Sequence, residues 1–131
     1  HTVGNCSQLL VLRLEHNNLS GTIPEALCQC VHLKRIVLSH NQLTGRIPAR
    51  IGNLHTLQEL ILDNNQLSGS IPPAIANCVH LTTCQLNRNQ LSGVITESIA
   101  HLKFLTALHL QDNSRTLHGK GSACFGGCCA V

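Results

Sequence analysis

The chain of 131 residues has no tryptophan, tyrosine or methionine and only two phenylalanines. A globular core of this length normally uses large rings to fill its centre, whereas thin stacked coils can be filled by leucine and isoleucine alone. No segment approaches the roughly 20 consecutive apolar residues that a membrane-spanning helix needs. The N-terminus also lacks the basic, apolar and cleavage regions of a signal peptide. These absences predict a narrow core, with no membrane span and no signal peptide in this chain.

The chain also lacks a concentrated block of charge. Its nine Lys and Arg residues alternate along the sequence with six Asp and Glu residues, and the formal net charge is +3. Nucleic-acid-binding surfaces need a dense basic stripe, usually with aromatic rings on which bases stack. We therefore expect no nucleic-acid partner. No Cys, His or carboxylate spacing fits a metal site, so we expect no metal and no cofactor.

What the sequence does contain is a period of 24 residues that runs without insertion or deletion from Leu9 to Asn113. Three apolar columns recur: Leu9, Leu33, Leu57, Leu81 and Leu105; Leu12, Ile36, Leu60, Cys84 and Leu108; Leu14, Leu38, Leu62, Leu86 and Leu110. A period of this length indicates a solenoid, because one such unit cannot bury its apolar face without a neighbour stacked on it.

The period divides the chain into a solenoid, 1–113, and an irregular tail rich in Gly and Cys, 114–131. Within the solenoid the predicted units are a partial repeat 1–8, full repeats 9–32, 33–56, 57–80 and 81–104, and a partial repeat 105–113. The chain begins in the middle of a repeat, which predicts a fragment of a longer protein. After Asn113, Leu117 and Gly119 come two residues late for the next unit, so we expect the tail to be irregular.

Each unit can be interpreted physically. Residues 58–64 alternate outward and inward side chains, with Leu60 and Leu62 pointing inward, which predicts a strand and, by stacking, a parallel sheet. An Asn then recurs where the chain leaves the sheet and can pair its turn groups, which predicts a ladder: Asn17, Asn41, Asn65, Asn89 and Asn113. The three-residue apolar spacing in 49–57 predicts a short 3₁₀ or irregular turn on the opposite side.

The consensus LxxLxLxxNxLSGxIPxxLxxLxxL resembles the plant-type leucine-rich repeat over about residues 3–113. This resemblance implies an α/β repeat solenoid, a right-handed horseshoe with a concave parallel sheet, and a second short strand around LSGxIP. It also implies an extracellular or plasma-membrane ectodomain and no enzymatic activity. Similar coils occur in receptor-like kinases, receptor-like proteins and secreted inhibitors of cell-wall polygalacturonases.

The outward positions of the strands change identity from coil to coil while the core columns hardly vary, so the concave face is the predicted binding surface. Val37 and Ile61 form an apolar spot on this face, flanked by charged residues. The candidate ligand-binding residues are Arg13, Glu15, Arg35, Val37, Glu59, Ile61, Asp63, Gln85, Asn87 and Arg88. His16 and His40 should stack about 5 Å apart as exposed side chains rather than as metal ligands.

The main hypothesis is a module that binds a peptide or protein ligand, with a co-receptor as a further candidate partner. One alternative is a polygalacturonase inhibitor, and another is a fragment without independent function. An enzyme with Cys124, Cys128 or Cys129 as nucleophile near His118 is disfavoured, because no rigid scaffold positions a base there. We therefore expect no catalytic residues.

Four cysteines replace core leucines, which predicts buried thiols: Cys6, Cys30, Cys78 and Cys84. Cys6 and Cys30 lie in adjacent coils and are near enough for a bridge in principle. Asn5 and Asn18 occupy N-glycosylation sequons, which are compatible with secretion.

Overall fold

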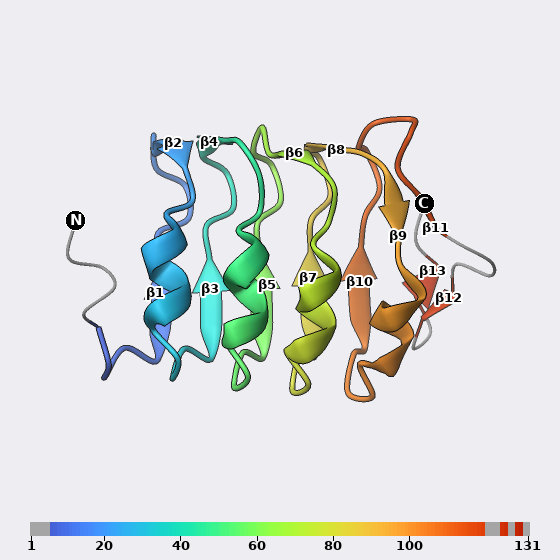
Figure 1. Cartoon of the computed structure of the whole chain (residues 1–131). Coiled ribbons are helices and arrows are strands. Elements are labelled where there is room, and N and C mark those ends of the chain that lie inside the picture. Colours follow the sequence, from blue (N-terminus) through green and yellow to red (C-terminus); the bar gives the residue numbers. More distant parts are fainter. Residues whose placement is uncertain (1–5, 120–123, 126–127, 130–131) are drawn as a thin grey trace.

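The computed structural model describes residues 6–119 together with the strand residues 124–125 and 128–129. The chain winds as a stack of similar coils (Figure 1). Four of them each contribute one strand to a common sheet and one short helix to the opposite side, and the last described coil contributes a strand. The solenoid class expected from the 24-residue period is confirmed. Among the described residues, no helix is long and apolar enough to cross a bilayer.

The main sheet has five parallel strands in the order β1-β3-β5-β7-β10. These strands are β1 (Val11–Arg13), β3 (Arg35–Val37), β5 (Glu59–Ile61), β7 (Thr83–Gln85) and β10 (Ala107–His109). Their register equals the sequence period, so Ile36 pairs with Leu12 on one side and Leu60 on the other. Equivalent side chains therefore lie above one another.

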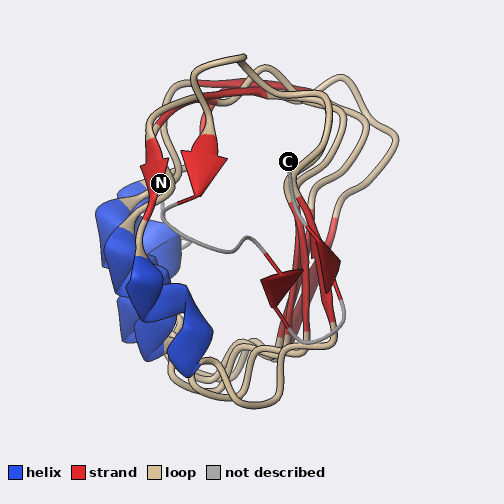
Figure 2. Ribbon diagram, turned by 90° about the vertical axis from the view of Figure 1, so that its right-hand side faces the viewer, coloured by secondary structure: helices blue, strands red, loops and turns tan. Residues whose placement is uncertain are grey.

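Short 3₁₀ helices cover the side of each coil that faces away from the main sheet (Figure 2). They are η2 (Glu25–Gln29), η3 (Ala49–Asn53), η4 (Pro73–Asn77) and η5 (Glu97–His101). Pro24, Pro48 and Pro72 precede the first three helices, and Thr96 precedes the fourth. Proline suits this position because its fixed φ matches an extended residue at a helix start and it has no N–H to satisfy.

Further short strands around the LSGxIP step form a third side of the coil, as the resemblance implied. They pair in parallel as β2 (Ser20–Thr22) with β4 (Gln42–Thr44), β6 (Ser68–Gly69) with β8 (Gln90–Leu91), and β9 (Val94–Ile95) with β11 (His118–Gly119). Gly21, Gly45, Gly69 and Gly93 all have positive φ, from +77° to +83°. At this turn glycine avoids the strain that a Cβ would introduce.

The core consists of the apolar columns. Leu38, Leu62 and Leu86 are 5%, 1% and 0% exposed and lie on one interior line. The N-terminal end is less covered, since Leu14 of the same column is 40% exposed. Packing of this kind, coil upon coil, is what stabilises a solenoid.

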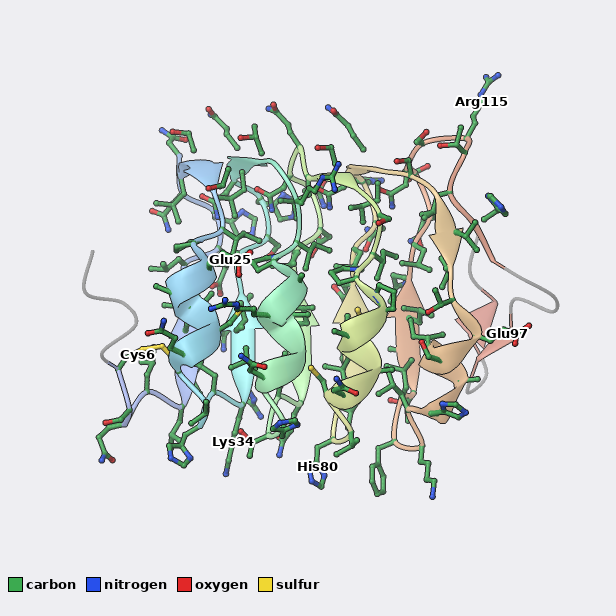
Figure 3. The ribbon with its side chains drawn as sticks, viewed as in Figure 1. Cys6, Glu25, Lys34, His80, Glu97 and Arg115 are labelled. Carbon is green, nitrogen blue, oxygen red and sulfur yellow. A yellow bond between two sulfur atoms is a disulfide. The ribbon has the colours of Figure 1, made fainter. Side chains whose placement is uncertain are left out.

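The prediction that Cys6 and Cys30 are free thiols is wrong, because the two residues form a disulfide (Figure 3). They occupy one column in successive coils, and stacking brings their Cα atoms to 5.4 Å, a normal separation for a disulfide. Cys78 and Cys84 are buried free thiols, as is Cys28 on η2. Burial raises the pKa of Cys28 to about 11 and those of Cys78 and Cys84 to about 12.

The chain after Asn113 differs from the irregular tail that we expected, since residues 114–119 continue the stack. The Ser114 N–H donates to the Leu91 carbonyl, Leu117 is buried, and β11 pairs with β9. A local turn, in which the Thr116 N–H donates to the Ser114 hydroxyl, takes up the two extra residues. Beyond it, β12 (Cys124–Phe125) and β13 (Cys128–Cys129) form an antiparallel pair, with β13 beside β10.

Candidate ligand-binding face

The exposed surface of the main sheet, which we call the sheet face, is formed by the outward residues of the five strands and the residues that follow them. Val37 and Ile61 are paired in register at its centre, and both are half-buried. They form a small apolar spot between neighbouring strands. A half-buried apolar pair with a polar surround is the arrangement found at the centre of protein interfaces.

Ion pairs run across the sheet face and neutralise its arginines. Arg35 Nε lies 2.6 Å from Glu59 Oε2, between adjacent strands beside the apolar spot. At the N-terminal end of the face, Arg13 Nη2 at the end of β1 lies 3.0 Å from Glu15 Oε1. These pairs are solvent-exposed, so each contributes little to stability. Their effect is to leave the surround of Val37 and Ile61 nearly neutral on this side.

The pKa of Glu15 is lowered from its usual value. The largest cause is a hydrogen bond from the Glu15 backbone N–H, which favours the ionised carboxylate. Partial burial acts in the opposite direction, and the bond from Arg13 and the positive charges of Arg13 and His16 lower the pKa further. Glu15 therefore carries its negative charge over a wide pH range.

Asp63 lies on the sheet face but is more buried than we expected, at 9% exposed. Its Oδ2 accepts a hydrogen bond of 2.8 Å from Asn64 Nδ2 and lies 3.8 Å from His40 Nε2, whereas its buried Oδ1 has no hydrogen-bond partner. The parallel hydrogen bonds of the main sheet continue past β5, since the His40 N–H donates to the Asp63 carbonyl and the Asn64 N–H to the Asn87 carbonyl. The Asp63 side chain is covered by its neighbours His40 and Asn64. Ser39, at the equivalent position of the preceding coil, is also buried.

The remaining candidates lie towards the C-terminal side of the face. Gln85, at the end of β7, is half-buried beside Ile61, and Asn87 is half-buried beyond the strand. Arg88 is exposed, and its Nε lies 3.5 Å from Asp112 Oδ2 in the next coil. The structure thus brings the apolar spot and the Arg35–Glu59 pair together with the residues on either side of the spot, Arg13 opposite Val37 and Gln85 opposite Ile61. Arg88 lies beyond the end of β7.

One row of the face has a backbone conformation that sequence reasoning missed. The residues that follow Asp63 and its equivalents all have φ between +57° and +59°: His16, His40, Asn64, Arg88 and Asp112. Left-handed backbone is uncommon for non-glycine residues. Asn and Asp tolerate it best, so Asn64 and Asp112 were the available sequence signal, but the His and Arg members concealed it.

His16 and His40 stack as predicted, with ring centroids 4.3 Å apart and an angle of 11° between the planes. Both side chains are exposed. Within the described part of the chain, no group of three or more His, Cys, Asp or Glu residues is placed to hold a metal ion.

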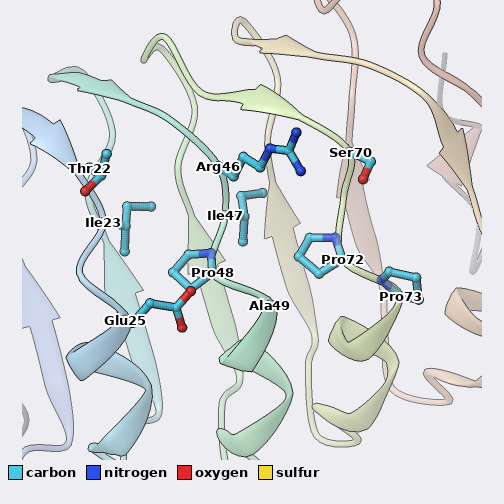
Figure 4. Close-up of a pocket in the computed structure, with 10 residues that line it drawn as sticks. All are labelled: Thr22, Ile23, Glu25, Arg46, Ile47, Pro48, Ala49, Ser70, Pro72 and Pro73. Carbon is cyan, nitrogen blue, oxygen red and sulfur yellow. The ribbon is translucent and has the colours of Figure 1, made fainter.

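A groove of about 470 Å³ lies away from the sheet face, beside the starts of the 3₁₀ helices (Figure 4). Its floor is apolar and rich in proline, with Pro48 and Pro72 from successive coils. Glu25 and Arg46 are the charged residues of its lining. Sequence reasoning did not single out this groove, because its residues are those that every repeat needs at the helix start.

Of the two predicted glycosylation residues, the structure describes one. Asn18 is exposed in the loop between β1 and β2, where an oligosaccharide could be accommodated. Asn5 lies outside the described residues, as do the side chains of Cys124, Cys128 and Cys129. His118, proposed as their partner, is exposed, with its Nδ1 2.7 Å from the Thr116 carbonyl.

Comparison with known proteins adds to this geometry. The chain matches the family model described as leucine rich repeat over residues 1–43 and 46–114. No individual curated sequence matches it. It is similar to the plant peptide hormone receptor RGFR1, solved in complex with RGF2, at 41% identity and a TM-score of 0.84 over 86% of this chain and 18% of that chain.

Two further solved structures extend the similarity. The Arabidopsis receptor kinase HAESA, solved with the peptide hormone IDA and the co-receptor SERK1, is 37% identical, with a TM-score of 0.83 over 91% of this chain and 19% of that chain. In the BIR3–SERK2 complex from Arabidopsis thaliana, the matching chain is 40% identical, with a TM-score of 0.75 over 82% of this chain and 57% of that chain. The chain thus spans less than a fifth of the two peptide-hormone receptors, at 18% and 19% of their lengths.

Proposed function

The chain belongs to the leucine-rich-repeat family, and on this premise we propose that it is a binding module for a peptide or protein, acting through the sheet face as part of an extracellular receptor. The observation that carries the proposal is the contrast between the two sides of each strand. The inward residues are nearly constant from coil to coil, whereas the outward residues around Val37 and Ile61 differ in every coil. Side chains released from packing constraints are available for recognition.

The relatives support this role over the alternatives. RGFR1 and HAESA were solved with peptide hormones, and HAESA also with a co-receptor. By analogy, a peptide ligand and a co-receptor are the partners that we propose for the protein to which this module belongs. The polygalacturonase inhibitor is the weaker candidate, because the relatives described above are receptors and their partners. The role assigned is binding, with no catalytic step.

The proposal is tested by selecting peptides from a displayed random library on the immobilised chain and measuring their affinity for variants. Exchange of the ion pair by Arg35→Glu with Glu59→Arg should weaken a selected peptide about tenfold or more, because the charges beside the apolar spot are reversed. The matched control is Glu25→Arg with Arg50→Glu, which reverses charges on adjacent coils at the 3₁₀ side. Equal affinities of both double variants would contradict the assignment of the sheet face.

A further inference from the structure

The charges of the sheet face do not balance. The face carries three arginines, and each of them is paired with a carboxylate: Arg13 with Glu15, Arg35 with Glu59, and Arg88 with Asp112. Asp63 is the fourth carboxylate, and its neighbour within 4 Å is a histidine rather than an arginine or lysine. Among the carboxylates of the face, Asp63 is therefore the one whose partner is neither arginine nor lysine.

This carboxylate is also poorly solvated. Asp63 is 9% exposed, its Oδ1 is buried without a hydrogen-bond partner, and its Oδ2 accepts from Asn64. A buried carboxylate needs an opposite charge or several donors to offset the loss of water. Because the site is shielded from solvent, a cation placed near it would be attracted more strongly than at an exposed carboxylate.

The carboxylate lies next to the apolar spot. The ladder of parallel hydrogen bonds runs on from β5 through Asp63, whose carbonyl accepts from the His40 N–H. Ile61 and Asp63 are therefore two residues apart along nearly extended chain, and their side chains are separated by about 6–7 Å. In an extended peptide, side chains at positions i and i+2 point to the same side with the same spacing. An aliphatic side chain over Val37 and Ile61 would therefore bring the side chain two residues away towards Asp63.

We infer that the sheet face selects an extended peptide in which a basic side chain lies two residues from an aliphatic one, the aliphatic group packing on Val37 and Ile61 and the cation facing Asp63. This inference rests on the proposed function, since it names the ligand chemistry of the same face. His40, 3.8 Å from Asp63 Oδ2, stands beside the position that the cation occupies.

The test uses the whole chain with methyl and amide labels for NMR, titrated with acetylated and amidated Gly-Leu-Gly-X-Gly peptides in which X is Lys, Gln or Glu. The Lys peptide should shift the methyl signals of Val37 and Ile61 and bind roughly tenfold more tightly than the Gln peptide, with the Glu peptide weakest. Asp63→Asn should reduce the ratio between Lys and Gln peptides to about one. Glu97→Gln, which removes a carboxylate from the 3₁₀ side, should leave the ratio unchanged.

His40→Gln separates two explanations of Asp63. If the carboxylate serves the ligand, the preference for lysine survives this substitution, whereas its loss would show that Asp63 serves only to hold His40 and would overturn the inference. Equal binding of all three peptides at the sheet face would also overturn it, while the proposed function would stand. Shifts confined to other surfaces, or no shift at the face with any peptide, would contradict both.

Discussion

At the scale of single residues, the asparagine that follows each strand of the main sheet from β3 onwards joins two coils. The side chain of Asn65 donates from Nδ2 to the carbonyls of Leu62 and Asp63 in its own coil and of Leu38 in the preceding one, at 3.0–3.3 Å. Its Oδ1 accepts from the Leu43 N–H of the preceding coil at 3.0 Å. One buried amide thus bonds four backbone groups. The three carbonyls also accept from other donors, namely Asn41, Asn89 and the His40 N–H, whereas the Leu43 N–H depends on Asn65.

Replacement of Asn65 by alanine should therefore lower the free energy of unfolding by about 2–4 kcal/mol, because the buried Leu43 N–H loses its partner and three carbonyls each lose one donor. Asn17 provides the matched control. It is exposed and donates to the carbonyls of Leu14 and Glu15 in its own coil. Asn17→Ala should cost less than about 1 kcal/mol. Urea denaturation of the two variants measures both costs, and equal values would refute the role of the buried ladder.

The buried thiol of Cys84 makes stability depend on pH at the alkaline end. Burial raises its pKa from 9.0 to about 12, so the folded state keeps the proton while the unfolded chain loses it. The stabilisation is fully present below pH 9 and is lost between pH 9 and 12, at roughly 1.4 kcal/mol per pH unit. Cys84→Leu places in this column the residue found at Leu60 and should reduce the loss of stability between pH 8 and 10. An unchanged difference between the two pH values would contradict the prediction.

At the scale of the element, the two kinds of strand pair with different registers. The main sheet pairs residues 24 apart, whereas Ser20 of β2 pairs with Gln42 of β4, 22 residues away. The 24-residue period could not reveal this difference, because it fixes which residues are equivalent in successive coils but not which of them face each other in the short strands around the LSGxIP step. The two extra residues before Leu117 were visible in the sequence. The sequence did not predict that a turn at Ser114 accommodates them and lets the next strand keep its place in the stack.

The disulfide fastens the first described coil to the second across a sequence separation of 24. Removal by Cys6→Ala with Cys30→Ala should cost about 3 kcal/mol, the value expected when a loop of this length is freed in the unfolded state. Cys30 is fully buried, so part of the loss will come from packing. The single variant Cys78→Ala, in the same column without a bridge, measures that packing part. Calorimetry should show the larger fall in melting temperature for the double variant.

At the scale of the whole molecule, the sequence predicted the fold well and the site partly. The constant columns of apolar residues determine which residues face the interior. From them the sequence predicted the sheet, the 3₁₀ turns and the interior column that contains Leu38, Leu62 and Leu86. The burial of Asp63 could not be predicted, because it depends on how the side chains of His40 and Asn64 lie against its carboxylate. A leucine-like column likewise could not distinguish a free thiol at Cys78 from a bridged one at Cys30, since both fill the same volume.

The stack should open from its less covered end. The amides of Leu14 and Leu62 make equivalent bonds, of 2.9 Å to Val37 O and 2.8 Å to Gln85 O, but Leu14 is 40% exposed and Leu62 1%. Local opening exposes amides at the ends of a repeat array before those at its centre. Hydrogen exchange should therefore be faster by a factor of roughly ten or more at Leu14. Equal rates would indicate that all coils open together.

The inter-coil bonds of the asparagines all run in one direction along the solenoid. Asn41, Asn65, Asn89 and Asn113 each reach back to the coil before their own, and each completes a turn that its predecessor leaves open. Removing a repeat from the C-terminal side takes away the asparagine that holds an N–H of the coil that remains. Removing one from the N-terminal side leaves the asparagine partner of every remaining coil in place. For the asparagine ladder, shortening the array is therefore unequal at its two ends.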